Sequence, residues 1–322
     1  MLKILYIMPH LSTGGGPQVG LLTFQEMLNL GHDVYVIDYT DFPAFDYIIQ
    51  KDKIRDLVGD DKLYSLPLEE KESVLSIVDN ISPDIVHIHE MAESFISDRL
   101  LNILYRPDRK YKIFETSHNS VFDMSKKRVL PDGFVFINET HKNSYGIYDT
   151  DSIIWFPEFS RFERPDRTEA LLGLGLDPLK KHVVNVGLFQ PIKNQAEVFK
   201  YARKFPDVSF HFIGNTAPNF KDYWEPLLNN KPENCKLWGE RYDVEKFFGS
   251  MDLHLFTSRP YRGMSESMPV VLRESVQNWG QKTLFYNNPR YDGIYDNEPS
   301  VKYLTENFDN NCELIREALY GT

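Results

Sequence analysis

The chain has 322 residues, of which 42% are hydrophobic and 26% are charged; this composition excludes an intrinsically disordered protein, and the length is enough for two domains with separate cores. A formal net charge of −11 argues against nucleic-acid binding and against strong adsorption to anionic membranes, so we expect no nucleic-acid partner and at most weak peripheral membrane contact. No apolar run approaches the roughly 20 residues that span a bilayer, and the first residues lead into a strand pattern and not a signal peptide, so we expect a cytoplasmic protein.

The first half of the chain alternates strand and helix patterns. The apolar run Lys3–Met8 predicts a buried strand. It leads into the glycine cluster Gly14–Gly16, and Pro17 and Gly31 mark where the next helix would begin and end. Later strands are expected at Val34–Ile37, Ile85–Ile88, Lys112–Glu115 and Phe134–Ile137. This alternation predicts a parallel sheet with helices on both faces.

The alternation lapses between residues 155 and 169 and then resumes. We therefore expect two domains, residues 1–160 and 161–322. Strands of the second domain are expected at His182–Gly187, Phe210–Gly214, Leu253–Phe256 and Thr283–Tyr286, and helices at Asn194–Lys204 and Val270–Trp279. The predicted fold class is α/β, with two Rossmann-like domains. Because ligands of open parallel sheets bind outside the carboxyl ends of the strands, we expect the site in a cleft across which the two sheets face each other.

The glycine cluster Gly14–Gly16 joins a strand to a helix. Such a junction offers backbone N–H groups and the positive end of a helix to an anion such as phosphate. Three consecutive glycines can also form a tight connection without any ligand. The spacing is not the G-x-G-x-x-G of a dinucleotide fingerprint, which disfavours a nicotinamide-dependent oxidoreductase.

Two glutamates, Glu266 and Glu274, stand eight positions apart across a junction between a loop and a helix, where Pro269 suits the first helical turn. Eight helical residues rise about 12 Å, whereas carboxylates that act on one glycosidic bond lie within roughly 5 to 9.5 Å. The pair is better placed to hold two ends of a long ligand, with the helix N-terminus near Met268 and Val270 facing its middle. Hydroxyl groups at both ends and phosphate between them describe a nucleotide-sugar. Two solvated glutamates beside a helix start would have the same sequence.

A lysine follows the first strand of the second domain after a short loop. The strand ends at Gly187, and Lys193 stands where the next helix begins. This arrangement brings a compact cation to a phosphate group. An ordinary surface lysine would fit the same pattern.

In combination, these motifs resemble the retaining GT-B glycosyltransferases grouped as glycosyltransferase family 4, over nearly the whole chain. The most specific match is the E-x7-E signature, Glu266–Glu274. The other matching segments are Gly14–Gly16 with Asn29–Val34, Pro83–His89, Thr116–His118 and Gly187–Asn194. The fold that this resemblance implies is GT-B.

The resemblance implies a hexosyltransferase that moves a sugar, with retention of configuration, from a nucleotide-sugar such as a UDP- or GDP-sugar to a glycan, lipid-linked or small-molecule acceptor. No metal or other cofactor is implied. Catalytic roles are implied for His118 and Glu266, which would contact the donor sugar. Donor-binding roles are implied for Gly15, Gly16, Lys193, Arg241, Tyr242, Ser267, Met268, Val270 and Glu274. Within this set, Lys193 would contact the diphosphate and Glu274 the ribose.

One position departs from the family pattern. Leu188 stands directly after Gly187, where the family usually has an arginine. Arg259 or Arg262 could supply the missing charge from the loop 258–265. The loss also leaves open a non-catalytic subunit that binds a nucleotide-sugar. A nucleotide-sugar 2-epimerase shares the architecture and is the other alternative, against which the E-x7-E signature argues.

Several features have simpler interpretations. Asp149 and Asp151 have the spacing of a metal-binding D-x-D motif, but turn chemistry is the favoured interpretation. Cys235 and Cys312 are expected to be reduced thiols. His87 and His89 lie on an expected strand and are interpreted as core residues. The basic runs Arg106–Lys110 and Lys126–Arg128 are expected to be solvated surface.

Overall fold

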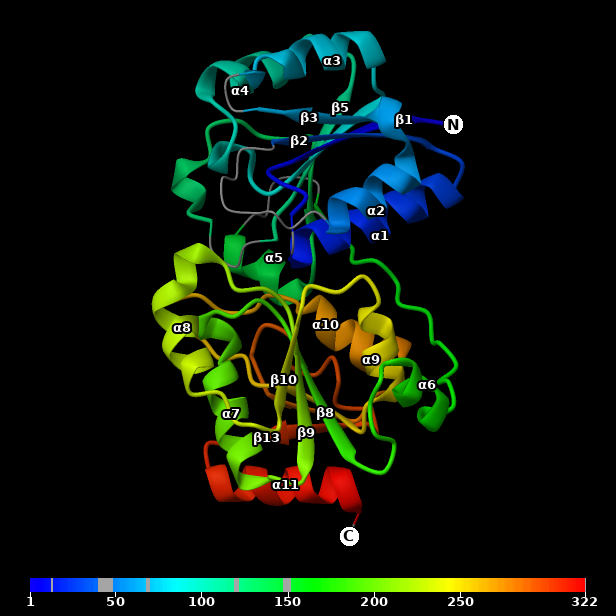
Figure 1. The fold of residues 1–322 in the computed structure, drawn as a ribbon. Coiled ribbons are helices and arrows are strands. Elements are labelled where there is room, and N and C mark those ends of the chain that lie inside the picture. Colours follow the sequence, from blue (N-terminus) through cyan, green and yellow to red (C-terminus); the bar gives the residue numbers. More distant parts are fainter. Residues whose placement is uncertain (13, 40–48, 68–69, 119–121, 147–151, 322) are drawn as a thin grey trace. The chain divides into compact units, whose positions relative to one another are not determined.

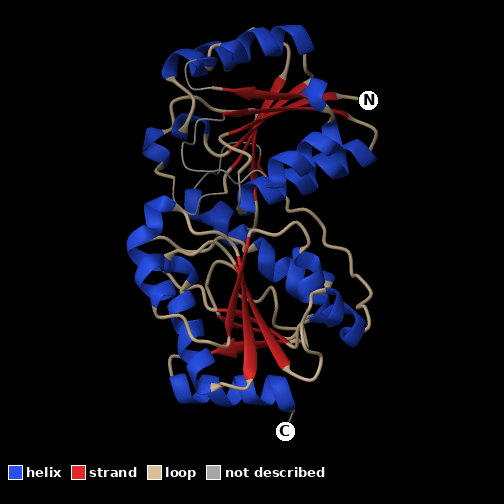
Figure 2. Cartoon of the chain, in the orientation of Figure 1, coloured by secondary structure: helices blue, strands red, loops and turns tan. Residues whose placement is uncertain are grey.

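The computed structural model describes residues 1–12, 14–39, 49–67, 70–118, 122–146 and 152–321 of the chain. These residues form two compact units, Met1–Pro157 and Glu158–Thr322. Each unit is a parallel β-sheet with helices on both faces (Figures 1 and 2). The predicted fold class, two parallel α/β units, is confirmed.

The sheet of the first unit has the strand order β3-β2-β1-β4-β5-β6-β7. Its strands are β1 (Lys3–Met8), β2 (Asp33–Tyr39), β3 (Leu63–Leu66), β4 (Ile85–His89), β5 (Lys112–Thr116), β6 (Gly133–Phe136) and β7 (Ser152–Ile154). Its helices are α1 (Gly15–Asn29), α2 (Ile49–Val58), α3 (Ser73–Ile81), α4 (Asp98–Leu104) and α5 (Glu139–Tyr145).

Strand β1 is buried on both faces of this sheet. Leu5 and Ile7 pack into the cluster under α3 and α4, whereas Ile4, Tyr6 and Met8 pack into the cluster under α1 and α2. This alternation explains why the strand is an unbroken apolar run, since successive strand residues point to opposite faces and here both faces are covered.

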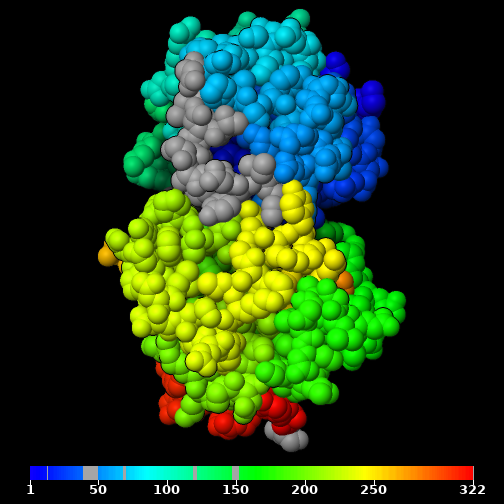
Figure 3. Space-filling view, viewed as in Figure 1, coloured from blue at the N-terminus to red at the C-terminus, as the bar shows by residue number. Residues whose placement is uncertain are grey.

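The sheet of the second unit has the strand order β10-β9-β8-β11-β12-β13. Its strands are β8 (Lys181–Val186), β9 (Val208–Ile213), β10 (Cys235–Gly239), β11 (Leu253–Phe256), β12 (Thr283–Tyr286) and β13 (Val301–Leu304). Its helices are α6 (Arg167–Gly173), α7 (Gln195–Lys204), α8 (Lys221–Asn229), α9 (Val244–Ser250), α10 (Val270–Leu272) and α11 (Phe308–Tyr320), with a π-helix at Arg273–Asn278. Helices α7 and α11 share one hydrophobic cluster with the sheet, and α6 and α9 share another. Helix α11, red in Figures 1 and 3, forms one end of the unit.

The strands that the sequence predicted are the inner strands of the two sheets, and their bounds agree within two residues. Four strands were not predicted: β3, β7, β10 and β13. All four are edge strands. Edge strands are partly open to solvent, and β10, for example, buries only its first residue fully, so they lack the apolar runs that mark the inner strands.

The helix expected at Val270–Trp279 differs in type. Only Val270–Leu272 is α-helical, and the chain continues as a π-helix to Asn278. Pro269 precedes the helix with an extended ψ of 112° and does not occupy its first turn. Gly280, with a φ of +53°, follows the end of the π-helix.

None of the helices within the described parts of the chain is both long enough and apolar enough to cross a lipid bilayer.

Candidate functional site

In both sheets the strand order reverses between two neighbouring strands. The reversal lies between β1 and β4 in the first unit and between β8 and β11 in the second. Loops that leave the carboxyl ends of such strands diverge to opposite faces and leave a crevice for a ligand. Most of the site residues that the sequence predicted follow these strands or their neighbours.

In the first unit, the glycine cluster lies between β1 and α1. Helix α1 begins at Gly15, and Gly14 precedes it with a φ of +131°, a conformation that favours glycine. Gly15 is exposed and Gly16 is half-buried in the first turn of this helix. An added Cβ at Gly16 would meet nothing within 4 Å. The space beside Gly16 in this turn is therefore not filled by other atoms of the described residues.

A histidine pair lies at the carboxyl ends of β4 and β5. His89 is the last residue of β4, and His118 follows β5 by two residues. The two rings are joined by a hydrogen bond of 3.0 Å between His118 Nε2 and His89 Nδ1. Burial lowers the pKa of His118 to about 4, and the nearby His141 lowers it further in the same direction. His118 is therefore a neutral imidazole near pH 7.

The interpretation of His87 and His89 as core histidines is confirmed for His89, which is 1% exposed. His87 is partly exposed, and its Nε2 forms a hydrogen bond of 2.7 Å with Thr116 Oγ1. Burial lowers the pKa of His87 to about 3.

In the second unit, two glycines bring the ends of β8 and β9 close together. Gly187 has a φ of +151° and Gly214 a φ of +140°. A Cβ at Gly214 would lie 2.2 Å from the carbonyl oxygen of Gly187, and a Cβ at Gly187 would lie 3.3 Å from the side chain of Lys193. Both positions therefore require glycine, and together they make room for Lys193 beside the end of β8.

Lys193 ends a 3-10 turn, Pro191–Lys193, and α7 begins two residues later, after Asn194. The hydroxyl of Thr257, at the end of β11, donates to the carbonyl oxygens of Lys193 and Asn194 at 3.0 and 3.1 Å. The loop after β8 is thus fixed to the neighbouring strand at the point of reversal. The ammonium of Lys193 lies 5.3 Å from the centre of the Phe256 ring.

Glu266 lies in the loop before α10, and its carboxylate forms an ion pair of 2.7 Å with the ammonium of Lys193. Both side chains are partly exposed, at 15% for Lys193 and 16% for Glu266. The structure therefore brings together two predicted site residues that are 73 positions apart in the sequence (266 − 193). A cation and a carboxylate side by side can contact a phosphate and a sugar hydroxyl of one ligand.

Glu274 belongs to the π-helix that follows α10 and is half-buried. Single-turn π segments are rare in proteins, and those that occur are often found at functional sites. Ser275, the next residue, is bound through its hydroxyl to Nδ1 of the buried His254 on β11 at 2.9 Å. This bond fixes the π-helix to the strand that also holds the Lys193 loop.

Of the predicted residues between the two glutamates, Ser267 is half-buried, whereas Met268 and Val270 are buried with 7% and 6% exposure. Their apolar side chains are packed in the protein, so only their backbone groups are suited to hydrogen-bond a ligand.

Arg241 and Tyr242 follow β10, at the carboxyl edge of the second sheet. Arg241 forms two hydrogen bonds with the carboxylate of Asp243, at 2.8 and 3.0 Å. Tyr242 is 49% exposed. The backbone of this segment leaves the sheet after Gly239, whose φ is +68°.

The two arginines that could supply the charge missing at Leu188 differ in their contacts. The Arg259 guanidinium lies 2.8 Å from Glu306 and 3.6 Å from Glu197, and it stacks 3.7 Å from the ring centre of Tyr286. Its charge is therefore already balanced by carboxylates. Arg262 is exposed at the tip of a tight hairpin, with a φ of +48°. Its guanidinium lies 5.3 Å from the ring centre of Tyr261, and among the described residues no carboxylate pairs with it, so the structure favours Arg262 over Arg259 as the uncompensated cation of this loop.

Sequence reasoning missed Glu197, which supports the Lys193 loop from α7. Its carboxylate accepts from Asn194 Nδ2 and from the Tyr201 hydroxyl, both at 2.6 Å, and also from the Tyr286 hydroxyl. The signal was present: Asn194 and Glu197 have the spacing of residues that cap the start of a helix.

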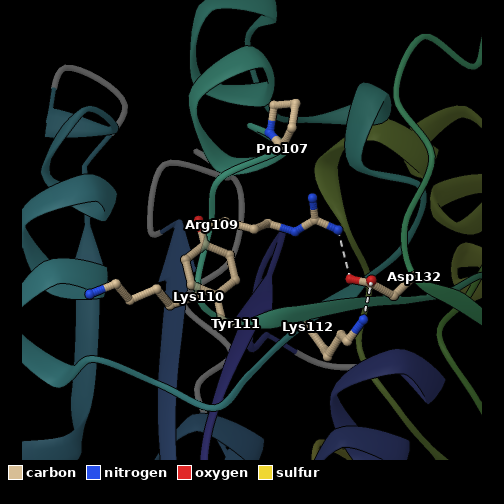
Figure 4. Close-up of a pocket in the computed structure, with 6 residues that line it drawn as sticks. All are labelled: Pro107, Arg109, Lys110, Tyr111, Lys112 and Asp132. Carbon is tan, nitrogen blue, oxygen red and sulfur yellow. Dashed lines mark hydrogen bonds and ion pairs between the residues drawn. The ribbon is translucent and has the colours of Figure 1, made fainter.

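A pocket of about 180 Å³ lies at the amino ends of the strands of the first sheet, where β5 begins. It is lined by Pro107, Arg109, Lys110, Tyr111, Lys112 and Asp132 (Figure 4). Arg109 and Lys112 both bind the carboxylate of Asp132, at 2.7 and 3.0 Å. Much of the local positive charge is thus neutralised, and the pocket lies at the amino ends of the strands, away from the crevice.

The expectation that the run Lys126–Arg128 is solvated is wrong for Lys127. Its side chain is 3% exposed and forms ion pairs with Glu93 at 2.6 Å and Glu115 at 2.7 Å. The reason is that two buried carboxylates need a cation in the same low-dielectric surroundings.

Among the described residues, no group of three or more histidine, cysteine, aspartate or glutamate side chains is arranged to hold a metal ion. Asp149 and Asp151, the possible D-x-D motif, lie outside the described residues. Cys235 and Cys312 are buried free thiols, as expected.

The fold matches that of solved glycosyltransferases. HepE of Anabaena, in a complex with UDP-glucose, aligns with 98% of this chain and 89% of its own, with a TM-score of 0.74 and 12% sequence identity. A glycosyltransferase of Rickettsia africae aligns with 98% of this chain and 88% of its own, with a TM-score of 0.70 and 14% identity. Sucrose-phosphate synthase of Thermosynechococcus elongatus aligns with 98% of this chain and 89% of its own, with a TM-score of 0.71 and 11% identity. No protein-family model and no curated protein sequence matches the chain. The fold is therefore GT-B.

Proposed function

We propose that the protein is a glycosyltransferase that transfers a hexose from a nucleotide-diphosphate sugar to an acceptor. The observation that carries the proposal is the ion pair between Lys193 and Glu266 at the strand reversal of the second sheet, with Glu274 eight residues further along. A cation for phosphate and carboxylates for hydroxyl groups are what a nucleotide-sugar requires. The structural similarity to HepE, which was solved with UDP and with UDP-glucose, supports the same class of ligand.

In this proposal Lys193 binds the diphosphate, Glu266 binds hydroxyls of the transferred sugar and Glu274 binds the ribose. The segment Arg241–Tyr242 receives the base through its backbone, since the arginine side chain is held by Asp243. Ser267, Met268 and Val270 contribute backbone groups before and at the start of α10.

The first unit supplies the remaining groups. The exposed first turn of α1, at Gly15 and Gly16, provides backbone donors for the diphosphate. His118 provides a neutral imidazole that contacts the donor sugar. We propose these contacts for the ligand-bound protein.

The chemistry follows from where charge develops. As the bond between the sugar and the diphosphate breaks, negative charge grows on the leaving phosphate, and Lys193 with preorganised N–H groups stabilises it. A lysine in this role makes a divalent metal unnecessary, so we propose metal-independent transfer. We further propose retention of configuration, with the departing phosphate accepting the proton of the attacking hydroxyl on the same face of the sugar. The acceptor is a glycan, a lipid-linked sugar or a small molecule.

Leu188 favours one alternative function, a subunit that binds a nucleotide-sugar without transferring it, because an expected phosphate-binding charge is missing. A nucleotide-sugar 2-epimerase is the other alternative. The three functions differ in what they release. A transferase releases nucleotide only when an acceptor is present. An epimerase converts the sugar without an acceptor, and a binding subunit neither releases nucleotide nor converts the sugar.

The test is calorimetric titration of UDP, GDP and their hexose derivatives into the wild type and into Glu274→Gln. We expect one nucleotide family to bind and the variant to lose about 10-fold or more in affinity, as for a lost hydrogen bond to a charged group. The matched control is Glu225→Gln on the surface of α8, which should bind as the wild type does. Absence of binding by every nucleotide would overturn the proposal, and binding that is equal in Glu274→Gln would overturn the assignment of the site.

If a nucleotide-sugar binds, its release as free nucleotide is followed with and without a panel of acceptors. Binding without release under any condition favours the binding subunit. Conversion of the sugar without an acceptor favours the epimerase.

A further inference from the structure

The hydrogen bond between His118 and His89 allows only two arrangements of protons. Nε2 of His118 and Nδ1 of His89 lie 3.0 Å apart, and the bond needs a hydrogen on one nitrogen and a lone pair on the other. Burial lowers the pKa of both histidines, so neither ring is charged near pH 7. Each neutral ring carries one N–H. The nitrogen that carries the shared hydrogen therefore decides the tautomer of both rings.

The surroundings of His89 distinguish the two arrangements. His89 is 1% exposed, and the rings of Tyr6, Phe24 and His87 lie 5.6, 6.3 and 4.8 Å from its ring, centre to centre. Its second nitrogen, Nε2, is buried and has no hydrogen-bond partner among the described residues.

If His118 donated the shared hydrogen, the hydrogen of His89 would be on Nε2, where a buried N–H would have no acceptor among these residues. If His89 donates from Nδ1, its Nε2 is a bare nitrogen, and it is a lone pair of His89, not an N–H group, that is left without a partner among the described residues. Buried N–H groups without an acceptor are rare in proteins, and under-satisfied acceptors are less so. The second arrangement is therefore the more stable one.

We propose that His89 is a positioning residue that donates from Nδ1 to His118 and holds His118 in the tautomer with its hydrogen on Nδ1. His118 then offers a ligand an N–H donor from Nδ1 and not a lone pair. This inference rests on the proposed function for the identity of the ligand, a donor sugar whose oxygen would accept the bond. Under this arrangement His118 orients the sugar and is not a general base.

The tautomer is measured directly by NMR of protein labelled with ¹⁵N in histidine, without any ligand. Protonated and bare imidazole nitrogens resonate far apart, and His118→Gln identifies the signals of His118. We expect a protonated Nδ1 and a bare Nε2 for His118 between pH 6 and 8. A protonated Nε2, or a mixture of both tautomers, would overturn the proposal whether or not the protein is a glycosyltransferase.

Two variants then separate positioning from simple packing. In His89→Asn, the amide nitrogen attaches at the same place as Nδ1 and can donate, so the His118 tautomer should persist. In His89→Leu, which fills the site without a donor, His118 should become a mixture of tautomers. His87 and His141, the other histidines that influence this pair, serve as internal references in the same spectra.

The same variants have a functional readout. We expect the leucine variant to lose about 10-fold in kcat, the scale of one hydrogen bond, with a smaller change in KM, and the asparagine variant to recover most of the loss. Equal losses in folded asparagine and leucine variants, with the tautomer unchanged in both, would show a packing role only. If no sugar is transferred by the wild type, the proposed function fails while the NMR result still decides the tautomer.

Discussion

The ammonium of Lys193 lies 2.7 Å from the carboxylate of Glu266. Lys193 comes from the loop after β8 and Glu266 from the loop before α10, and the loop of Lys193 is fixed to β11 by Thr257. A phosphate that binds Lys193 must therefore compete with a carboxylate that is already in place. A nucleotide-sugar can compensate by offering hydroxyl groups of its hexose to Glu266, whereas a free nucleotide has no hexose.

This competition predicts opposite effects of Glu266→Gln on two ligands. The affinity for UDP should rise by about 2- to 5-fold, because a partly exposed ion pair is worth up to about 1 kcal/mol and no longer has to be broken. The affinity for UDP-glucose should fall relative to UDP, because the amide is a weaker acceptor for sugar hydroxyls. Calorimetric titration of both ligands checks this, with Glu225→Gln as the control. An equal loss of affinity for UDP and UDP-glucose would contradict it.

The glycine at position 214 is predicted to be essential for the stability of the second unit. In Gly214→Ala the new Cβ would lie 2.2 Å from the carbonyl oxygen of Gly187, at a φ of +140° that L-residues avoid. We expect a loss of about 2 to 4 kcal/mol in the free energy of unfolding. Urea denaturation measures it.

The matched control for this substitution is Gly173→Ala, at the exposed end of α6, where an added Cβ meets nothing within 4 Å. This variant should be neutral or slightly more stable, by up to about 1 kcal/mol. Similar midpoints for the two variants would contradict the close approach of β8 and β9.

Buried histidines predict a loss of stability in mild acid. Burial lowers the pKa of His211 and of His254 to about 3, whereas in the unfolded chain both have a pKa near 6.5. Below pH 6.5 the unfolded state therefore binds protons that the native state does not, so the free energy of unfolding falls as the pH falls. Each residue contributes about 1.4 kcal/mol per pH unit between about pH 6 and pH 4.

The measurement is urea denaturation of the wild type and of His254→Asn from pH 7.5 to pH 4.5. The asparagine can keep the bond to Ser275 and has no proton to bind, so the slope of stability against pH should decrease by about one proton. An unchanged slope would mean that His254 titrates alike in both states.

The buried cation Lys127 is predicted to be necessary for the stability of the first unit. Lys127→Met would leave the carboxylates of Glu93 and Glu115 without their cation, and each now accepts a bond of 2.6 to 2.8 Å from it. We expect a loss of about 3 to 5 kcal/mol. Lys126→Met, at the exposed neighbouring position, should change stability by less than about 0.5 kcal/mol.

A double variant distinguishes charge from packing in this cluster. Because Glu115→Gln removes one of the two uncompensated charges, Glu115→Gln combined with Lys127→Met should be more stable than Lys127→Met alone. Thermal unfolding of Lys127→Met and of the double variant decides this, and a double variant that is less stable than Lys127→Met would contradict the electrostatic explanation.

The sequence by itself determined the two parallel sheets. Inner strands such as β1 and β11 are buried on both faces, so they are mostly apolar and are visible without a structure, although β1 begins with the exposed Lys3 and β11 contains the buried His254. The edge strands β7 and β10 meet solvent and carry no such pattern, so their presence depends on the neighbours with which they pair. The sequence also placed Glu266 before a helix and Glu274 inside it, because proline and glycine are strong local signals. It did not reveal the π-helix, since helix type depends on which distant groups bind the turn, such as His254 at Ser275.

Only the tertiary structure decided which side chains meet. Lys193 and Glu266 are joined because β8 and β11 are neighbours in the sheet, and His89 and His118 because β4 pairs with β5. The sequence pattern predicts that Lys127 is a surface residue. Its side chain is buried because it pairs with two carboxylates from elsewhere in the chain. The pattern of apolar and polar residues along a strand or helix follows from which residues are buried, so it can be recognised in the sequence. Contacts between charged groups far apart in the chain depend on strand order, and strand order follows from how the whole sheet packs.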